Sequence, residues 1–134
     1  MYHGSCLCGK IKFTLTGKIN DIVYCHCSQC RKAQGSAFAT NANVDKENFS
    51  FISGEKNLTA YNYTDEQTKY FCKSCGSPIM SKNVNHPENI RIRLGTIDSD
   101  ISERPEAHIF VASKANWEEI CDSLPQHTEY KTHA

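Results

Sequence analysis

Eight cysteines in a chain of 134 residues, most of them in tight groups, limit more than any other feature what this chain can fold into. The groups are Cys6-x-Cys8, Cys25-x-Cys27-x-x-Cys30 and Cys72-x-x-Cys75, while Cys121 stands alone. The first twenty residues contain no continuous apolar segment, so we expect no secretory signal and a location in the reducing cytoplasm, where disulfides seldom persist. Clustered cysteines in that compartment are typical of metal ligands.

Two of the groups have the format of a zinc knuckle, a tight turn that offers two thiolates and is followed by glycine. They are Cys6-x-Cys8, before Gly9, and Cys72-x-x-Cys75, before Gly76. Zinc in structural sites takes four ligands in a tetrahedron, so each knuckle alone is incomplete. We therefore predict that the two knuckles share one four-thiolate zinc, which would fasten the start of the chain to its middle.

The remaining group, Cys25, Cys27 and Cys30, supplies three thiolates and predicts a second zinc with an open fourth position, the pattern of catalytic sites. Two alternatives stay open. A histidine could close the site, and the candidates by residue type are His3, His26, His86 and His108. The two sites could also exchange cysteines. His26 lies between two ligands, and alternating side chains in extended backbone diverge, so it is expected to point away from the metal.

Charge decides which chemistry an open three-thiolate zinc favours. The ion and its three thiolates carry a formal charge of −1, so this metal is a poorer activator of water than one held by three neutral histidines. It is better suited to hold a substrate thiolate, because bound zinc deprotonates a thiol and orients its sulfur. Arg31 and Lys32 follow Cys30 directly; they would either help an anionic thiol to dock or form a solvated helix face.

The hydrophobic pattern predicts one mainly β domain over residues 1–134. Residues 10–16 and 90–94 alternate apolar and polar side chains, as half-exposed strands do. Further strands are expected at residues 37–42, 48–52, 58–63, 68–71, 78–81 and 108–111. Two short helices are expected, one capped by Ser28 and ended by Gly35, and one starting at Ser113 or Asn116 and running through Ile120.

For four further side chains the sequence predicts a structural position, in the core or facing solvent, and no role in a site. Arg91 and Arg93 alternate with apolar residues and are expected on the wet face of a strand. Trp117 is expected in the core, and Cys121 as a packed, partly buried thiol.

Composition excludes two classes of partner. Fifteen basic and fifteen acidic side chains give a formal net charge of zero, so no overall field steers the chain toward nucleic acid, and no basic stripe is visible. No apolar run approaches the ~20 residues that cross a bilayer, so no membrane partner is expected.

The cysteine groups in their sequence context resemble the glutathione-dependent formaldehyde-activating enzyme family, whose domain also occurs in centromere protein V. The resemblance is carried by residues 4–9 (GSCLCG), 25–36 (CHCSQCRKAQGS) and 71–78 (FCKSCGSP), and by the tail at residues 108–117 and 124–126. It spans nearly the whole chain, and three cysteine groups in this order are highly specific.

The resemblance implies a β-tent fold, in which short antiparallel β-sheets are held together by zinc. It also implies a structural zinc on Cys6, Cys8, Cys72 and Cys75, and a labile catalytic zinc on Cys25, Cys27 and Cys30. The implied activity is that of a carbon–sulfur lyase that interconverts glutathione plus formaldehyde with S-hydroxymethylglutathione. Two other functions remain open: a scaffold in which both zincs are structural, and a module that binds or carries a small thiol such as glutathione without turnover.

Overall fold

Ten β-strands and one α-helix make up the part of the chain that the computed structural model describes, residues 1–130. The strands are β1 (Tyr2–Ser5), β2 (Lys12–Leu15), β3 (Asn20–Cys25), β4 (Ala39–Asp45), β5 (Phe49–Ser53), β6 (Leu58–Asn62), β7 (Gln67–Cys72), β8 (Pro78–Asn83), β9 (Asn89–Arg93) and β10 (Ala107–Ile109). Helix α1 spans Ser28–Gln34, and short 3-10 turns occur at Lys46–Asn48, Glu55–Asn57, Leu94–Thr96 and Val111–Ser113. The predicted mainly β fold class is confirmed.

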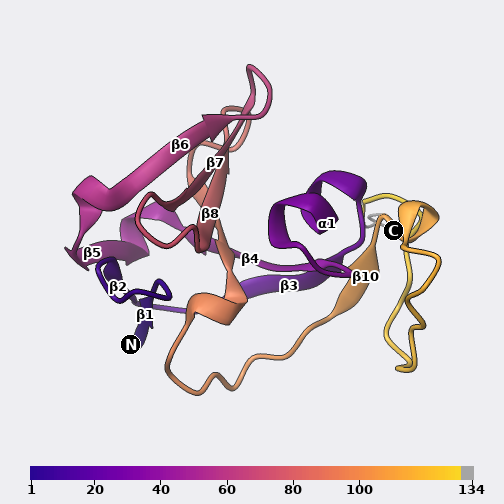
Figure 1. Cartoon of the computed structure of the whole chain (residues 1–134). Coiled ribbons are helices and arrows are strands. Elements are labelled where there is room, and N and C mark those ends of the chain that lie inside the picture. Colours follow the sequence, from indigo (N-terminus) through magenta and orange to yellow (C-terminus); the bar gives the residue numbers. More distant parts are fainter. Residues whose placement is uncertain (131–134) are drawn as a thin grey trace.

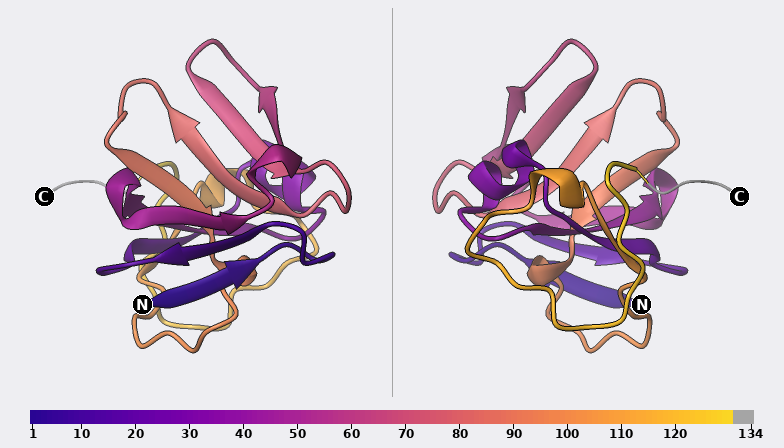
Figure 2. Two further views of the ribbon diagram at one scale, coloured as in Figure 1. Left: turned by 90° about the vertical axis from the view of Figure 1, so that its left-hand side faces the viewer. Right: turned by 90° about the vertical axis from the view of Figure 1, so that its right-hand side faces the viewer.

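The strands form two sheets, one of three strands in the order β1-β2-β5 and one of seven in the order β10-β3-β4-β9-β8-β7-β6. All pairs are antiparallel except β10 with β3, which is parallel. In Figure 1, β6, β7 and β8 rise at a steep angle to β3 and β4, and α1 lies inside the angle. Figure 2 shows the ends of the β6–β7 and β8–β9 hairpins projecting above the rest of the molecule. This bend leaves one face of the large sheet concave.

The core lies between the two sheets and is built from the inward positions of alternating strands. Phe13 and Leu15 of β2 are fully buried, and Phe13 stacks on Phe49 of β5 with ring centroids 5.0 Å apart. The large sheet contributes Ala42 and Val44 from β4 and the apolar positions of β8 and β9. Within residues 1–130, no helix has the length and apolar character needed to cross a lipid bilayer.

Most predicted strands form, with ends shifted by a few residues. The sequence pattern does not predict β1 or β3. Neither has the alternating signal: β1 reads YHGS, and β3 reads NDIVYC, two polar residues followed by a continuous run without alternation. Helix α1 ends as predicted, with Gly35 in the left-handed conformation at φ 63°. The second expected helix is wrong, because the chain makes a 3-10 turn at Val111–Ser113 and then only turns as far as residue 120.

Three expectations about burial are also wrong. Trp117 is 68% exposed, since without a helix nothing turns its ring toward the core. Cys121 is exposed, in the irregular segment after the expected helix. Arg93 does lie on the polar face of β9, but it is only 5% exposed, because that face lines the concavity of the bent sheet. The expectation for Arg91 holds better, since its side chain remains partly exposed.

Glu103 ties the N-terminal strand to the chain before β3, and we predict that this contact is lost in acid. Its carboxylate accepts a hydrogen bond from the Tyr2 hydroxyl at 2.5 Å and another from the backbone N–H of Ile19 at 2.8 Å. These bonds, that from Tyr2 first, lower the pKa of Glu103 to about 2. A carboxylate whose pKa falls on folding stabilises above its unfolded pKa, and that stabilisation disappears as the pH drops toward the folded value.

The measurement is denaturant unfolding of wild type and Glu103→Gln across this pH range. We expect the variant to be less stable at pH 7 and the difference to shrink between about pH 4.5 and 2. A difference that is constant with pH would contradict the role of the charge.

Candidate metal centres and the cleft beside them

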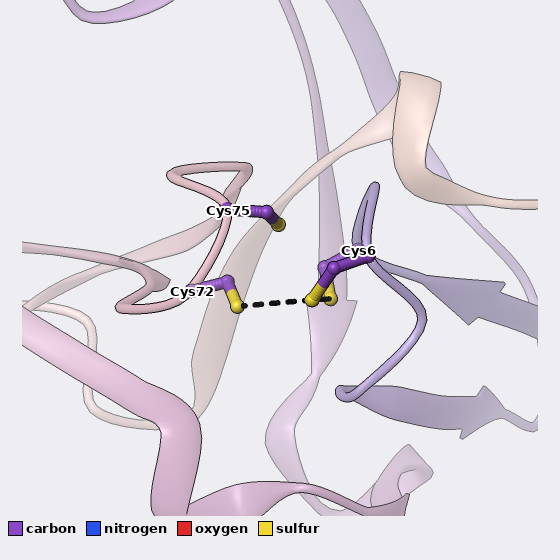
Figure 3. Close-up of side chains that lie close together, drawn as sticks. Cys6, Cys72 and Cys75 are labelled. Carbon is purple, nitrogen blue, oxygen red and sulfur yellow. Dashed lines mark hydrogen bonds between the residues drawn. The ribbon is translucent and has the colours of Figure 1, made fainter.

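Four sulfurs from two distant turns meet at the edge of the core. The turn after β1 carries Cys6 and Cys8, while Cys72 is the last residue of β7 and Cys75 lies in the turn that follows. The four Sγ atoms all lie within 4.8 Å of one another. Cys6 Sγ is 3.5 Å from Cys8 Sγ, which is 3.9 Å from Cys72 Sγ. Figure 3 shows Cys72 and Cys75 facing Cys6 across the gap between their turns.

These spacings fit a tetrahedral zinc. Zn–S bonds of about 2.3 Å place thiolate sulfurs about 3.8 Å apart, whereas a disulfide holds them at about 2.05 Å. The ligand sulfurs are also held by neighbours outside the set. The Ile11 N–H donates to Cys6 Sγ at 3.3 Å, and the Ser77 hydroxyl lies 3.3 Å from Cys75 Sγ, where hydrogen bonding lowers the pKa of that thiol to about 5. Such contacts orient metal ligands and favour their thiolate form.

Three further sulfurs meet where β3 passes into α1. Cys25 is the last residue of β3, Cys27 is the N-cap of α1 and Cys30 lies in its first turn; the three Sγ atoms are within 4.8 Å of one another. The expectation that Ser28 caps the helix is wrong, because Cys27 Sγ itself accepts the N–H of Cys30 at 3.3 Å. The cap thus brings the second and third sulfurs together.

This group has no fourth metal-ligating side chain of histidine, cysteine, aspartate or glutamate within residues 1–130. His26 turns away, as the alternation predicts, and forms a hydrogen bond with His108. The other three candidates, His3, His86 and His108, do not belong to the group either. The sulfurs divide into four and three, with no exchange of members between the groups. The geometry therefore matches one closed and one open set of thiol ligands.

Hydrogen bonding among the three sulfurs makes their ionisation unequal. Contact with Cys27 raises the pKa of Cys25, while contact with Cys25 lowers the pKa of Cys30 strongly. One thiolate is thus stabilised by two thiol neighbours. A divalent ion would displace the remaining protons, because thiolates and not thiols are metal ligands.

Next to these sulfurs, the buried side chains of His26 and His108 form a chain of hydrogen bonds that ends at the exposed carboxylate of Asp122. Asp122 Oδ2 accepts from His108 Nε2 at 2.9 Å, which leaves His108 Nδ1 to accept from His26 Nε2 at 2.8 Å. Burial lowers the pKa of His26 to about 4, so the ring is neutral at pH 7. The chain links β10 and the segment after it to the turn that carries Cys25 and Cys27.

The three sulfur-bearing residues line a cleft of about 440 Å³ on the concave face of the large sheet. Strand pairing explains why this face is polar. Asn43 lies opposite Arg91, Arg91 opposite Ser81, and Ser81 opposite Lys69, so four neighbouring strands present polar side chains in one row. The intervening residues Ala42, Ile92 and Met80 point into the core. Phe110 and Tyr130, whose rings pack 4.7 Å apart, line the cleft as well.

The cleft gathers positive charge in a chain that is neutral overall. Its lining includes Lys69, Lys82, Arg91 and Arg93, with Asp21 as its one carboxylate among the described residues. Arg31 and Lys32, which the sequence offered for docking an anion, do not line it. The alternation in residues 90–94 did place Arg91 and Arg93 off the core. The bend of the sheet, which makes that face the wall of a cleft, could not be read from this alternation.

Comparisons with known proteins agree with this architecture. An uncharacterized lyase of Schizosaccharomyces pombe is 28% identical over 84 residues, which cover 63% of this chain but only 59% of that relative. The crystal structure of a Rhodobacter sphaeroides protein has the same fold, with a TM-score of 0.60 and 24% identity over 75% of this chain and 91% of the other. The family model of the glutathione-dependent formaldehyde-activating enzyme matches residues 1–113. Because that match spans most of the sequence, the chain belongs to the glutathione-dependent formaldehyde-activating enzyme family.

Proposed function

We propose that this protein is a zinc-dependent carbon–sulfur lyase that acts on a small thiol adduct, with glutathione, formaldehyde and S-hydroxymethylglutathione as the reactants. The observation that carries the proposal is the group of three sulfurs, Cys25, Cys27 and Cys30, which lines a polar cleft and has no fourth described ligand. Family membership supports it, as does a relative named as a lyase.

In this proposal Cys6, Cys8, Cys72 and Cys75 hold a structural zinc, and Cys25, Cys27 and Cys30 hold the catalytic one. Zinc at the open site supplies a position that binds the thiol of glutathione as a thiolate. The chain's own residues fix the three ligand sulfurs: β3 positions Cys25, and the α1 cap positions Cys27 against Cys30. Because these ligands must stay reduced, we place the protein in the cytoplasm.

The reaction balances without any other reactant. The thiolate sulfur attacks the carbonyl carbon of formaldehyde, one C–S bond forms, and the carbonyl π electrons move to oxygen. That oxygen takes up a proton, equivalent to the one that the thiol released. The reverse reaction breaks the C–S bond and returns both reactants. The cleft orients the thiol and keeps part of the surrounding water away from its sulfur.

Cys27→Ser is the sharpest test, because serine is also a good helix cap and so preserves the start of α1. We expect the variant to retain one zinc per chain instead of two and to keep its melting temperature within about 5 °C, equivalent to roughly 1 kcal/mol in a domain of this size. Glutathione binding is expected to weaken by at least tenfold. Zinc content is measured by mass spectrometry and binding by titration calorimetry.

Cys121→Ser is the matched control, since Cys121 belongs to neither sulfur group. Unchanged glutathione binding after loss of the second zinc would sink the proposal. A wild-type protein that binds glutathione but does not accelerate adduct formation above the free reaction would instead be a thiol carrier.

A further inference from the structure

Arg93 is a buried cation without a carboxylate partner among residues 1–130. Its side chain is buried in the wall of the cleft, and Nη1 donates one long hydrogen bond of 3.4 Å to the carbonyl of Arg91. The one contact between a basic and an acidic side chain found within these residues joins His108 and Asp122. A guanidinium removed from water without a partner is costly, so a position like this indicates a missing anion.

Lys69 approaches the same place from β7. Its side chain is half-buried, lines the cleft and forms no ion pair with another described residue. Lys69 and Arg93 interact electrostatically with each other and with the three sulfurs. Burial and then mutual repulsion lower the pKa of Lys69, while the negative charge of Cys30 opposes that shift. Both cations therefore line the same cleft as Cys25, Cys27 and Cys30, and the negative charge of Cys30 opposes the lowering of the pKa of Arg93 by burial.

Charge balance suggests what the two cations do. A divalent zinc with three thiolates carries a formal charge of −1, so Lys69 and Arg93 together leave the empty open site with one positive charge in excess. A fourth thiolate removes that excess, whereas a neutral ligand does not. We propose that Lys69 and Arg93 are an anion-selecting pair, which makes the open position prefer a thiolate over a neutral ligand; this inference rests on the proposed function.

The pair is distinct from the sequence-adjacent cations Arg31 and Lys32, which do not line the cleft, and from exposed Lys82 near its rim. Charge matters more at Lys69 and Arg93 because both are shielded from water, and Coulomb interactions weaken less there than at a surface. The pair thus acts on the bound sulfur itself, independently of any carboxylate that the thiol carries.

The test uses the zinc-loaded full-length protein and three probes: glutathione, 2-mercaptoethanol, which has no carboxylate, and imidazole, which is a neutral ligand. We expect Arg93→Met and Lys69→Met each to weaken binding of both thiols by about tenfold, as loss of one charge from a shielded pair does. Imidazole binding should change by less than about twofold, and Arg93→Lys should restore most of the thiol affinity. Zinc content should remain at two ions per chain.

Lys12→Met is the matched control, since it removes one positive charge from an exposed position on β2, in the other sheet. Its thiol and imidazole affinities should equal those of wild type. Thiol affinities that are unchanged in both cleft variants, or an equal loss for thiols and imidazole, would overturn the anion-selecting pair while leaving the proposed function standing.

If Arg93→Met does not fold, Arg93→Gln and Lys69→Gln remove the same charges while keeping polar side chains in the cleft wall. Wild-type protein that binds neither thiol would overturn the proposed function and the role of the pair together. The two failures are therefore told apart by the wild-type titration alone.

Discussion

Replacing Cys72 with serine is expected to unfold the protein at room temperature or to make it aggregate. Cys72 is fully buried and belongs to the four-sulfur group that joins the turn after β1 to the turn after β7. Structural zinc contributes on the order of 10 kcal/mol of folding free energy in peptide models, which is comparable to the whole stability of a domain. The measurements are thermal unfolding by circular dichroism and zinc content by mass spectrometry.

The same result should follow from a strong chelator added to wild type, with slower onset because the two buried sulfurs protect the ion. Cys121→Ser supplies the control for cysteine substitution as such, because Cys121 is exposed and lies in neither group. Equal melting temperatures for Cys72→Ser and wild type would remove the structural role assigned to this group.

Gly54→Ala is expected to cost roughly 3 kcal/mol or more, the range of large effects in point variants. Gly54 has φ +79°, and a Cβ atom there would lie 1.9 Å from the carbonyl oxygen of Lys10. The left-handed conformation alone costs a side chain about 1–2 kcal/mol. The rest comes from the clash, because backbone atoms of Lys10 and Ile11 must move and neither is the flexible end of a side chain.

Gly35→Ala separates these two contributions. Gly35 has φ +63° at the end of α1, but an added Cβ would meet no atom within 4 Å. We expect it to lose only the conformational part, about 1–2 kcal/mol, in urea unfolding of the zinc-loaded protein. Because Lys10 follows Cys8 by two residues, Gly54→Ala should also weaken zinc retention, and equal losses in the two variants would contradict the clash.

The sulfur groups could be predicted because ligand number and sequence spacing are local information. One group, Cys25, Cys27 and Cys30, lies within six residues, and each knuckle offers two thiols. Because a structural zinc takes four ligands, the cysteines can be combined in only a few ways. The same holds for α1, because a single residue with positive φ, Gly35, determines where the helix ends. Alternation likewise placed Phe13 and Ile92 on buried faces correctly.

The polar cleft could not be predicted in this way, because it depends on how the strands bend. Alternation sets which side of β9 Arg93 occupies, but not whether that side meets water or a concave wall. The second helix failed for a related reason. The residues from Asn116 to Ile120 have helical character, yet the segment around them is fixed by contacts such as that of Asp122 with His108. Such a short helix is marginal without packing of its own.

The pairing of knuckles 64 residues apart also bears on how the chain reaches its native state. Closing a loop of that length costs roughly 4 kcal/mol of chain entropy at 25 °C, and this cost arises before native contacts can offset it. An ion held by either knuckle could capture the other during the conformational search. Refolding from urea should therefore be faster and more complete when zinc is present from the start than when it is added after dilution.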